Sequence, residues 1–463
     1  MNQIKQVATG LAGILFFSLP AKAQLNMAAM QDPHNSNNAV HYMPTYLGNG
    51  MKGWQVTLAN PYVTVGSNFT TARDVRDYLS SDEISNEMVS RTIGKLKSKD
   101  NIMQAGLDIA IVNAVINIPD RSGQPFLSIG FGVNERVEMS TVFNKELFQL
   151  AYQGNKQFAG QTISLAPRLN ALAYTDYYVS AAAEFKIPAT EISIKPAVRL
   201  RYLSGQASVY MPKSNLITMY TEPDGRYLDF GLNYEINTSL SGDDTVSLSS
   251  SAISLDRKNF RQGAGKGFGI DFGVRVSPLE NLSINIGFTD LGSLRFSKNA
   301  VNMANDTIYR YEGEEITFSD NGHITLDSIA GIAEPKYTYN SYRVKLPSKF
   351  TLAASLGLGK AEHKSLSYYR HNLTFVYLQG FDNYLSATKK PYVALGYTHS
   401  FNDVVNLGAN ASVGGLWGSG IGALMSFKFG FFRVGVSSNN LLPLIAPKSG
   451  KGTDVGLMLA FGR

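Results

Sequence analysis

Apolar side chains occupy every second position over unusually long stretches of this chain. In residues 127–139 one parity is apolar except at Glu135, and the other parity holds serine, glycine, asparagine, arginine and glutamate. Successive side chains of a strand point to opposite faces, so this pattern predicts one apolar face and one small or polar face. Strands of soluble sandwiches usually end after about five or six residues. The question is which solvent the apolar face meets.

The same alternation recurs along the rest of the chain. Most stretches have roughly the 9 to 11 residues that a tilted strand needs to cross a bilayer. Because an open sheet edge would leave backbone groups unpaired in hydrocarbon, such strands must close on themselves. The pattern predicts an all-β fold, a closed antiparallel transmembrane β-barrel, with a water-facing sandwich as the alternative. The stretches are 177–185, 192–202, 228–237, 268–277, 282–288, 350–358, 393–401, 405–413, 421–429, 432–436 and 455–461.

The links between these stretches differ in length at the two ends of the expected barrel. Short links at Ser277, Asn402 and Gly430 fall on one side, and long links at 239–266, 298–345 and 441–452 fall on the other. Short periplasmic turns and long outer loops are typical of outer-membrane barrels. If both chain ends lie in the periplasm, the number of strands must be even. The count is then about 14 if 54–67 and 102–118 lie outside the wall, and 16 if both belong to it.

One early region has a helical pattern instead. Apolar residues follow at helical spacing from Val75 to Leu79 and again from Ile84 to Leu96, and a second short helix is predicted at 144–152. The first helical region is expected either to plug the lumen or to sit in the periplasm. The expected organisation is a signal peptide at 1–23, an N-terminal segment with a helical hatch or plug at 24–100, and a barrel at 101–463.

The first residues predict export. Lys5 precedes the apolar run 7–19, and Ala21-Lys22-Ala23 forms a cleavage site before Gln24. The chain has no cysteine, so we expect neither a lipoprotein nor a disulfide scaffold.

Composition narrows the class further. The expected mature chain keeps 40 basic and 36 acidic residues, which gives no electrostatic support for a nucleic-acid partner. No run of 18 uncharged apolar residues follows Gln24, so helical spanning is excluded. The 43 glycines, 24 tyrosines and 25 phenylalanines indicate an exported, β-rich and aromatic chain.

Charged and polar residues on the inward parity are the candidates for a lumen or ligand path. Glu184 is expected to meet Lys195 or Arg199 across one strand pair, and Arg199 or Arg201 to meet Asp229 or Glu235 across the next. The set forms either an ion-pair lattice that holds the wall rigid or a polar constriction along a ligand path. The candidates are Asp176, Tyr178, Glu184, Lys186, Lys195, Arg199, Arg201, Asp229, Asn233, Glu235, Asp271, Arg275 and Arg433.

Catalysis and metal binding have little support in the sequence. The six histidines are isolated, and none has a serine and a carboxylate at motif spacing. No histidine or carboxylate cluster has metal-ligand spacing. We therefore expect no enzyme activity, no catalytic residue, no metal and no cofactor.

Four motifs carry a resemblance to a known family. "SIGFGVNERVEM" from Ser128, "KELFQLAYQGN" from Lys145, "LNALAYTDYYVSAA" from Leu169 and "VSSNNLLPL" from Val436 resemble uncharacterised outer-membrane barrels of Bacteroidota. That family is related to the FadL-type fatty acid transporters and to barrels of type IX secretion. The resemblance implies a wall of roughly 14 strands in a Gram-negative outer membrane.

The expected function follows from this class. FadL-type chains begin with an Asn-Pro-Ala hatch element, whereas the expected mature chain here begins "QLNMAAMQDP". We expect a porin-like or FadL-like barrel in outer-membrane lipid that binds or passes small hydrophobic molecules. The alternative is a non-transporting docking barrel that engages surface, periplasmic or secretion-system proteins through its outer loops.

Overall fold

The computed structural model describes residues 27–32, 36–49, 53–81, 85–121, 125–165, 167–239, 263–312, 335–363, 366–402 and 404–462. The expected signal peptide and its cleavage between Ala23 and Gln24 lie outside these residues. The helices are α2 (Met27–Gln31), α3 (Ser36–Ala39), η1 (Pro44–Tyr46), α4 (Ala72–Ser80), α5 (Asn86–Lys95), α6 (Lys145–Gln153), η2 (Lys156–Phe158) and α8 (Leu442–Ile445). The strands are β1 (Trp54–Ser67), β2 (Asn101–Pro119), β3 (Pro125–Phe143), β4 (Thr162–Ser164), β5 (Arg168–Ala183), β6 (Phe185–Lys186), β7 (Ser193–Tyr210), β8 (Leu216–Thr221), β9 (Leu228–Ser239), β10 (Gly265–Leu279), β11 (Leu282–Phe296), β12 (Ala300–Tyr311), β13 (Lys336–Thr338), β14 (Tyr342–Lys345), β15 (Lys349–His363), β16 (Leu366–Gly380), β17 (Tyr392–Phe401), β18 (Val405–Gly414), β19 (Gly418–Phe429), β20 (Phe432–Ser438) and β21 (Gly452–Gly462).

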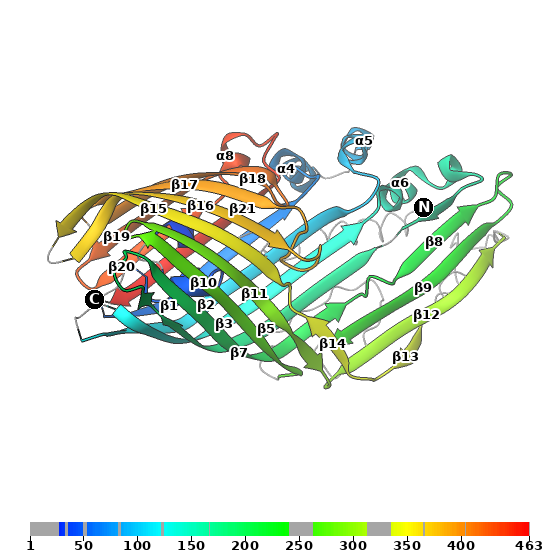
Figure 1. Ribbon diagram of the computed structural model, residues 1–463. Coiled ribbons are helices and arrows are strands. Elements are labelled where there is room, and N and C mark those ends of the chain that lie inside the picture. The colour runs from blue at the N-terminus through cyan, green and yellow to red at the C-terminus, as the bar shows by residue number, and fades with distance from the viewer. Residues whose placement is uncertain are drawn as a thin grey trace.

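Fourteen of these strands close into one antiparallel barrel (Figure 1). Closure pairs both edges of every wall strand, as a hydrocarbon environment requires. Within the described residues, no helix has the length and apolar character needed to cross a membrane. The predicted all-β barrel is confirmed. Neighbours follow the order β1, β2, β3, β5, β7, β10, β11, β15, β16, β17, β18, β19, β20 and β21, and β21 pairs with β1.

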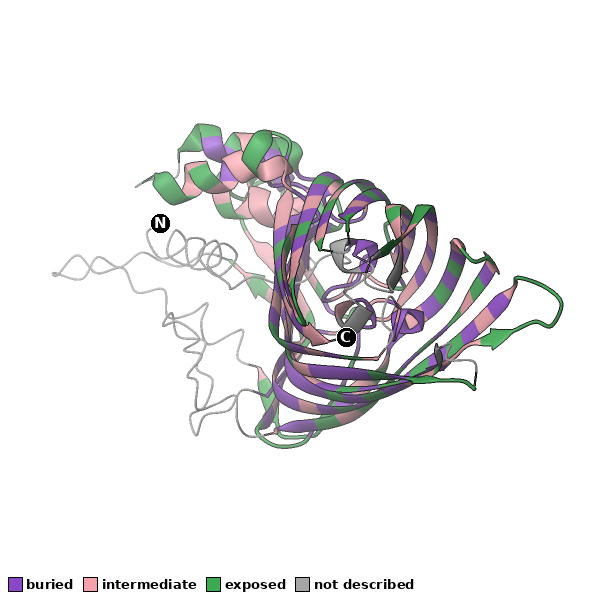
Figure 2. Cartoon of the chain, turned by 90° about the vertical axis from the view of Figure 1, so that its left-hand side faces the viewer, coloured by how far each residue is buried: buried purple, intermediate pink, exposed green. Residues whose placement is uncertain are grey.

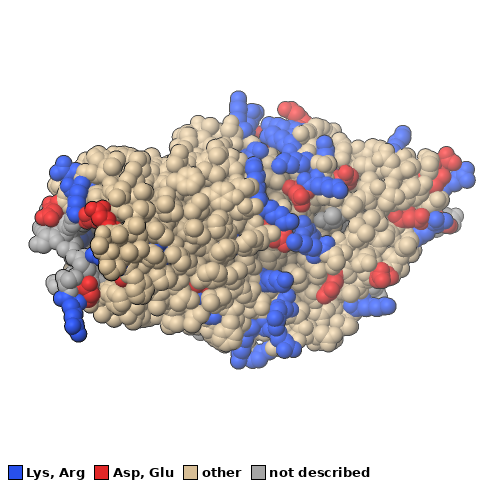
Figure 3. Space-filling model, in the orientation of Figure 1, with Lys and Arg blue, Asp and Glu red and all other residues tan. Residues whose placement is uncertain are grey.

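The apolar parity of the wall strands points away from the barrel axis. Phe268 and Leu395 are 73% and 64% exposed, whereas Asp271 and Thr398 on the opposite parity are fully buried. Buried and exposed residues alternate along the strands (Figure 2). A broad uncharged belt crosses the face seen in Figure 3, between a band rich in lysine and arginine and the charged residues at one end of the molecule. This belt is the surface that meets lipid.

The two ends of the barrel differ as predicted. Short turns join β10 to β11, β17 to β18 and β19 to β20 at one end, where Asn402 and Gly430 adopt φ of 48° and 63°. The longer connections from β7 to β10, from β11 to β15 and from β20 to β21 lie at the other end. We call these the short-turn end and the long-loop end, and the usual arrangement of outer-membrane barrels places the short-turn end in the periplasm.

The strand count corrects part of the prediction. β1 and β2 both belong to the wall, because β1 pairs with β2 and β21. The wall still has 14 strands, because β9 pairs with β8, β12 and only the last three residues of β7. The strands β4, β8, β9, β12 and β13 thus form an extension beyond the long-loop end. The expected boundary between residues 100 and 101 falls after the first wall strand.

Both predicted helical regions form, but the first lies in neither of the two expected places. α4 and α5 connect β1 to β2, so they lie where β1 ends, at the long-loop end. The backbone N–H groups of Ala72 and Arg73 donate to the carbonyls of Gly450 and Pro447 in the long β20–β21 connection, which confirms this position. The region is therefore neither in the lumen nor at the short-turn end. The predicted helix at 144–152 is confirmed as α6.

Candidate functional site

A short N-terminal segment fills the part of the lumen nearer the short-turn end. This inner segment comprises residues 27–32 and 36–49, with α2, α3 and η1. α2 contacts β16 to β20, α3 contacts β1 and β2, and η1 contacts β5, β7, β10 and β11. Contacts with such different parts of the wall show that the segment crosses the lumen.

Methionine and tyrosine side chains of the inner segment make an apolar contact with the wall. They pack on inward-facing residues of β15, β16 and β17, so one side of the lumen is apolar. Methionine is flexible and fills irregular space, which suits a contact between short helices and a strand wall. The cluster contains Met27, Met30, Ala39, Met43 and Tyr46 from the inner segment and Ala353, Val376, Leu378, Tyr392 and Ala394 from the wall.

Polar contacts hold the inner segment at both of its ends. Gln31 donates to the Ala409 carbonyl at 3.1 Å and accepts from Asn410 at 3.0 Å. Near the other end, Thr45 Oγ1 donates to Asn285 Oδ1 at 2.7 Å. These hydrogen bonds attach the inner segment to β18 and β11, in addition to its continuation along the chain into β1.

Lys195 fixes the last turn of the inner segment. Its Nζ donates to the Leu47 carbonyl at 2.6 Å and to Asn49 Oδ1 at 3.1 Å. Arg275 donates to the same Asn49 oxygen at 2.7 Å. Two cations from neighbouring strands therefore hold one short stretch of backbone.

His41 joins the inner segment to the charged residues of the wall. Its ring meets that of Tyr178 edge-on at 5.4 Å between centroids, and its Nε2 lies 3.2 Å from Asn113 Nδ2. Its Nδ1 contacts the Arg199 guanidinium, which lies 5.3 Å from the centre of the Tyr178 ring. Movement of the inner segment would break the contacts that His41 makes with Tyr178, Asn113 and Arg199.

Buried charges form an ion layer across the lumen, next to the inner segment. Asp290 is its centre, because it accepts from Arg201 Nη1 at 2.6 Å and Arg136 Nη1 at 2.7 Å and lies 3.2 Å from Lys349 Nζ. Buried charges depend on such partners, since an unpaired one is costly in a low-dielectric interior. The ion layer consists of Asp108, Arg136, Asp176, Arg199, Arg201, Asp271, Asp290 and Lys349.

An apolar layer covers the ion layer on the side of the long loops. On β5, β7 and β11 its residues lie nearer the long-loop end than those of the ion layer, and residues from β14 and from the connections at that end complete it, so the barrel interior is stratified. The layer contains Leu172, Tyr174, Leu203, Ala264, Leu294, Phe296, Val344, Leu346 and Leu385. In this structure the inner segment, the ion layer and the apolar layer occupy successive levels of the lumen.

Glu138 is the least satisfied polar side chain of this interior. It is fully buried on β3, between Gly106 of β2 and Leu172 of β5. Neither carboxylate oxygen accepts a hydrogen bond from the described part of the chain, and the Tyr384 hydroxyl is equally unsatisfied. Buried polar groups without partners are rare and often mark a functional site.

Several predicted path residues do come together. Arg201 pairs with Asp176 at 2.8 Å, and Arg199 pairs with Asp271. Tyr178, Lys195 and Arg275 contact the inner segment or its neighbours, as described above. Arg433 is buried on β20 and donates to Ser426 at 3.3 Å, away from the ion layer.

Other predicted residues lie elsewhere. Asp229, Asn233 and Glu235 belong to β9 in the extension, where Asp229 pairs with Arg310 at 2.8 Å. The expected pairing of Arg199 or Arg201 with Asp229 or Glu235 is wrong, because β10 and not β9 is the neighbour of β7 at this height. Lys186 is exposed on β6. Glu184 accepts from Ser193 Oγ at 2.8 Å instead of forming one of the expected ion pairs.

Sequence reasoning missed four central members of the site. Arg136 and Glu138 stand on the inward parity of the stretch 127–139, so strand parity alone was enough to include them. Asp290 adopts φ of 57° at an irregular point of β11, which breaks the alternation that marks inward positions. His41 lies in a segment without periodicity, and no sequence pattern places it in a barrel.

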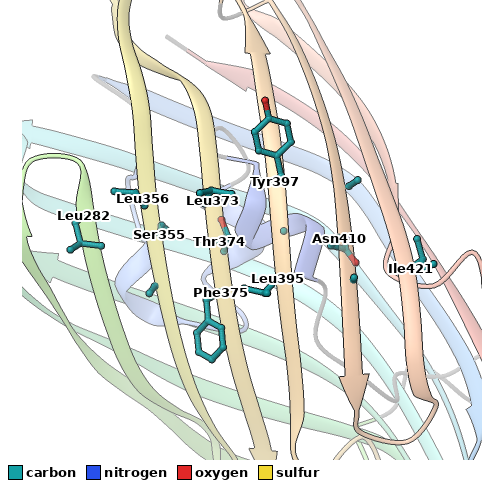
Figure 4. Close-up of a pocket in the computed structure, with 14 residues that line it drawn as sticks. Leu282, Ser355, Leu356, Leu373, Thr374, Phe375, Leu395, Tyr397, Asn410 and Ile421 are labelled. Atoms are coloured by element: carbon teal, nitrogen blue, oxygen red, sulfur yellow. The ribbon is translucent and has the colours of Figure 1, made fainter.

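The outer side of the same wall carries an apolar groove of about 600 Å³. Leu373, Leu395 and Ile421 stand around it (Figure 4). The small side chain of Ala409 leaves space between them, and Gly396, which also lines the groove, stands on the parity that faces the lumen. The pale helices behind the strands in Figure 4 belong to the inner segment. A Cβ atom on Gly396 would lie 2.0 Å from Gln31 Nε2. One layer of strand therefore separates the groove from the inner segment.

The closed wall, the uncharged belt and the unequal ends define an outer-membrane β-barrel of the Gram-negative type. The chain belongs to a family of unknown function, DUF5723, whose model matches residues 45–439. No curated protein matches the sequence.

Solved structures give only a broad likeness. The toluene transporter TbuX of Ralstonia pickettii is 10% identical, with 92% of each chain covered and a TM-score of 0.44. The toluene transporter TodX of Pseudomonas putida is 9% identical, with 91% of this chain and 92% of that chain covered and a TM-score of 0.41. A FadL homologue of Pseudomonas aeruginosa is 10% identical, with 92% and 93% covered and a TM-score of 0.40. At these values the likeness extends to neither substrate nor mechanism.

Proposed function

We propose that this barrel binds small hydrophobic molecules in its lumen and passes them across the outer membrane when the inner segment moves aside. The observation that supports the proposal is the apolar, methionine-rich contact between the inner segment and β15, β16 and β17. A water-filled pore has a polar interior, whereas this part of the lumen is apolar. A hydrophobic molecule could replace the side chains of Met27, Met30 and Met43 on the same wall.

The way the inner segment is held fits a displaceable plug. The contacts of Gln31, Thr45 and Asn49 with the wall are hydrogen bonds. Water could replace each of them when the inner segment moves aside. The ion layer, in contrast, belongs to wall strands and would stay in place. Arg136, Arg201 and Asp290 would then form a polar constriction next to an apolar binding chamber, and the apolar layer beyond it would have to open as well.

An engineered disulfide that can be reduced again tests the proposal. Because the chain has no native cysteine, no other disulfide can form. Thr45→Cys combined with Asn285→Cys replaces a 2.7 Å hydrogen bond with a disulfide between the inner segment and β11. The control pair, Asp229→Cys with Arg310→Cys, joins directly opposed residues of β9 and β12 in the extension. Purified variants in liposomes are compared for uptake of a small apolar fluorescent dye, oxidised and reduced.

We expect dye uptake by the native chain and by both reduced variants. Oxidation should stop uptake only in the Thr45–Asn285 variant. Uptake that continues with the disulfide fully formed would show that the inner segment does not gate the path. A native barrel that carries no dye under any condition would reject transport and favour the docking alternative.

A further inference from the structure

Two histidines that are 28 positions apart in the sequence meet on the outside of the barrel. His371 of β16 and His399 of β17 are direct cross-strand partners. Their Nδ1 atoms are 3.3 Å apart, and their ring centroids are 4.8 Å apart. The Tyr397 hydroxyl lies 2.7 Å from the Nδ1 of His371 and 3.4 Å from that of His399.

This arrangement presents three donor atoms to one point. Zinc binds imidazole nitrogen at about 2.0–2.1 Å, so two nitrogens of a tetrahedral site lie about 3.3–3.4 Å apart. The observed separation of 3.3 Å matches that value. Neutral imidazole can offer Nδ1 as a ligand when its proton is on Nε2. The phenol oxygen of Tyr397 provides a third donor, and water can complete the set.

The position of the pair allows an ion to enter from water. His371 opposes Leu358 of β15. Tyr369 lies two residues nearer the turn between β15 and β16, and it opposes Lys360. Lys360 forms an exposed ion pair with Glu280 at 2.6 Å, which marks the edge of the uncharged belt. The histidines therefore lie at the short-turn edge of the belt, beside the aromatic ring of Phe401.

We propose that His371 and His399, with Tyr397, form a site for a single Zn²⁺ ion at the short-turn edge of the barrel. The ion would join β16 to β17 close to the turn that connects β17 with β18. Because the site faces outward, it is independent of the inner segment and of transport.

Calorimetric titration of the full mature chain with ZnCl₂ tests the proposal. The protein must carry no polyhistidine tag and must be stripped of metal with a chelator beforehand. We expect one Zn²⁺ per chain and an increase in the unfolding temperature, because the ion binds only the folded strands. Mg²⁺ should have neither effect, since it prefers oxygen ligands.

Substitutions distinguish Zn²⁺ binding at this site from Zn²⁺ binding by other histidines of the chain. His371→Gln and His399→Gln should each abolish the stoichiometric binding and the Zn²⁺-dependent thermal shift. Tyr397→Phe keeps both imidazoles but removes the third donor, so it should still bind Zn²⁺, more weakly than the native chain does. His323→Gln removes a histidine elsewhere in the chain and should bind like the native protein.

Two outcomes would overturn the proposal. One is the absence of Zn²⁺ binding by the native chain, which would leave the pair as a hydrogen-bonded contact between imidazoles. The other is equal binding by the native chain and the His371→Gln/His399→Gln double variant. The unfolding temperature of each variant without Zn²⁺ guards against a loss of binding that is caused only by misfolding.

Discussion

Asp290→Asn is the substitution that most sharply tests the ion layer. Asp290 accepts hydrogen bonds from Arg136 and Arg201 and lies 3.2 Å from the ammonium group of Lys349. Its backbone φ of 57° is left-handed, a conformation that asparagine adopts as readily as aspartate. The substitution thus removes the charge and leaves shape and backbone almost unchanged.

The expected cost is large because three cations lose a common partner. Removing one member of a buried ion pair typically costs about 3–5 kcal/mol, since the remaining charge is left uncompensated in a medium of low dielectric. Arg201 keeps Asp176 at 2.8 Å, and Arg136 keeps Asp108 only at 3.5 Å. We therefore expect a loss in the free energy of unfolding within this range, with Arg136 as the residue most affected.

Urea-dependent folding into short-chain lipid vesicles provides the assay, with tryptophan fluorescence as the signal. Asp229→Asn is the matched control, because it removes one carboxylate from the exposed Arg310 pair in the extension. It should leave the unfolding free energy close to the native value. Adding Lys349→Gln to Asp290→Asn should recover part of the loss, because one uncompensated cation is removed.

The reasoning is refuted if Asp290→Asn unfolds at the same urea concentration as the native chain. It is also refuted if the loss is no greater than that of Asp229→Asn. Either result would mean that water or movement of the wall compensates the charges of the ion layer.

Three further predictions concern other levels of the barrel. Glu138→Gln should leave stability unchanged or raise it by about 1–3 kcal/mol in the same assay, because the carboxylate receives no hydrogen bond from the described residues; a comparable loss contradicts this. Gly396→Leu should push Gln31 away and speed hydrogen exchange in α2, whereas unchanged exchange would mean that the inner segment does not pack there. Asp74→Asn should speed exchange in α4 and α5, because it removes the carboxylate charge that pairs with Lys95 of α5, whereas the Thr71 cap keeps an acceptor at position 74. Burial raises the pKa of Asp74, but hydrogen bonds from Lys95 and Thr71 outweigh it and lower the pKa below its usual value. The native helices should therefore keep this stabilisation above the ordinary carboxyl pKa and lose it as the pH falls through the lowered one. Equal protection at neutral and strongly acidic pH, relative to the intrinsic exchange rate at each pH, contradicts the prediction.

The wall could be predicted from the sequence because side-chain parity is a local property of a strand. Leu395 faces outward and Thr398 inward whatever their neighbours are, so alternation was sufficient to predict a barrel. The pairing of charges is not local. β9 has the same alternation as a wall strand, and only its pairing with β8 and β12 shows that Asp229 lies outside the lumen.

The inner segment could not be predicted for a different reason. α2 and α3 have five and four residues, too short to be stable alone, so contacts with the wall determine that they form. His41 therefore had no pattern that linked it to Arg199. His371 and His399 looked isolated because only the register of β16 and β17 brings them together.

The two tryptophans allow the most direct test of the central claim that lipid lies outside the wall and packed protein inside. Trp54 begins β1 and is 43% exposed on the outward parity, whereas Trp417 is 2% exposed in a cluster with Ile102 and Val142. Variants with Trp54→Phe or Trp417→Phe each keep one fluorophore, and both are reconstituted in bilayers of brominated lipid. The account predicts strong quenching of Trp54 and little quenching of Trp417. Equal quenching of the two, or quenching of Trp417 alone, would contradict it.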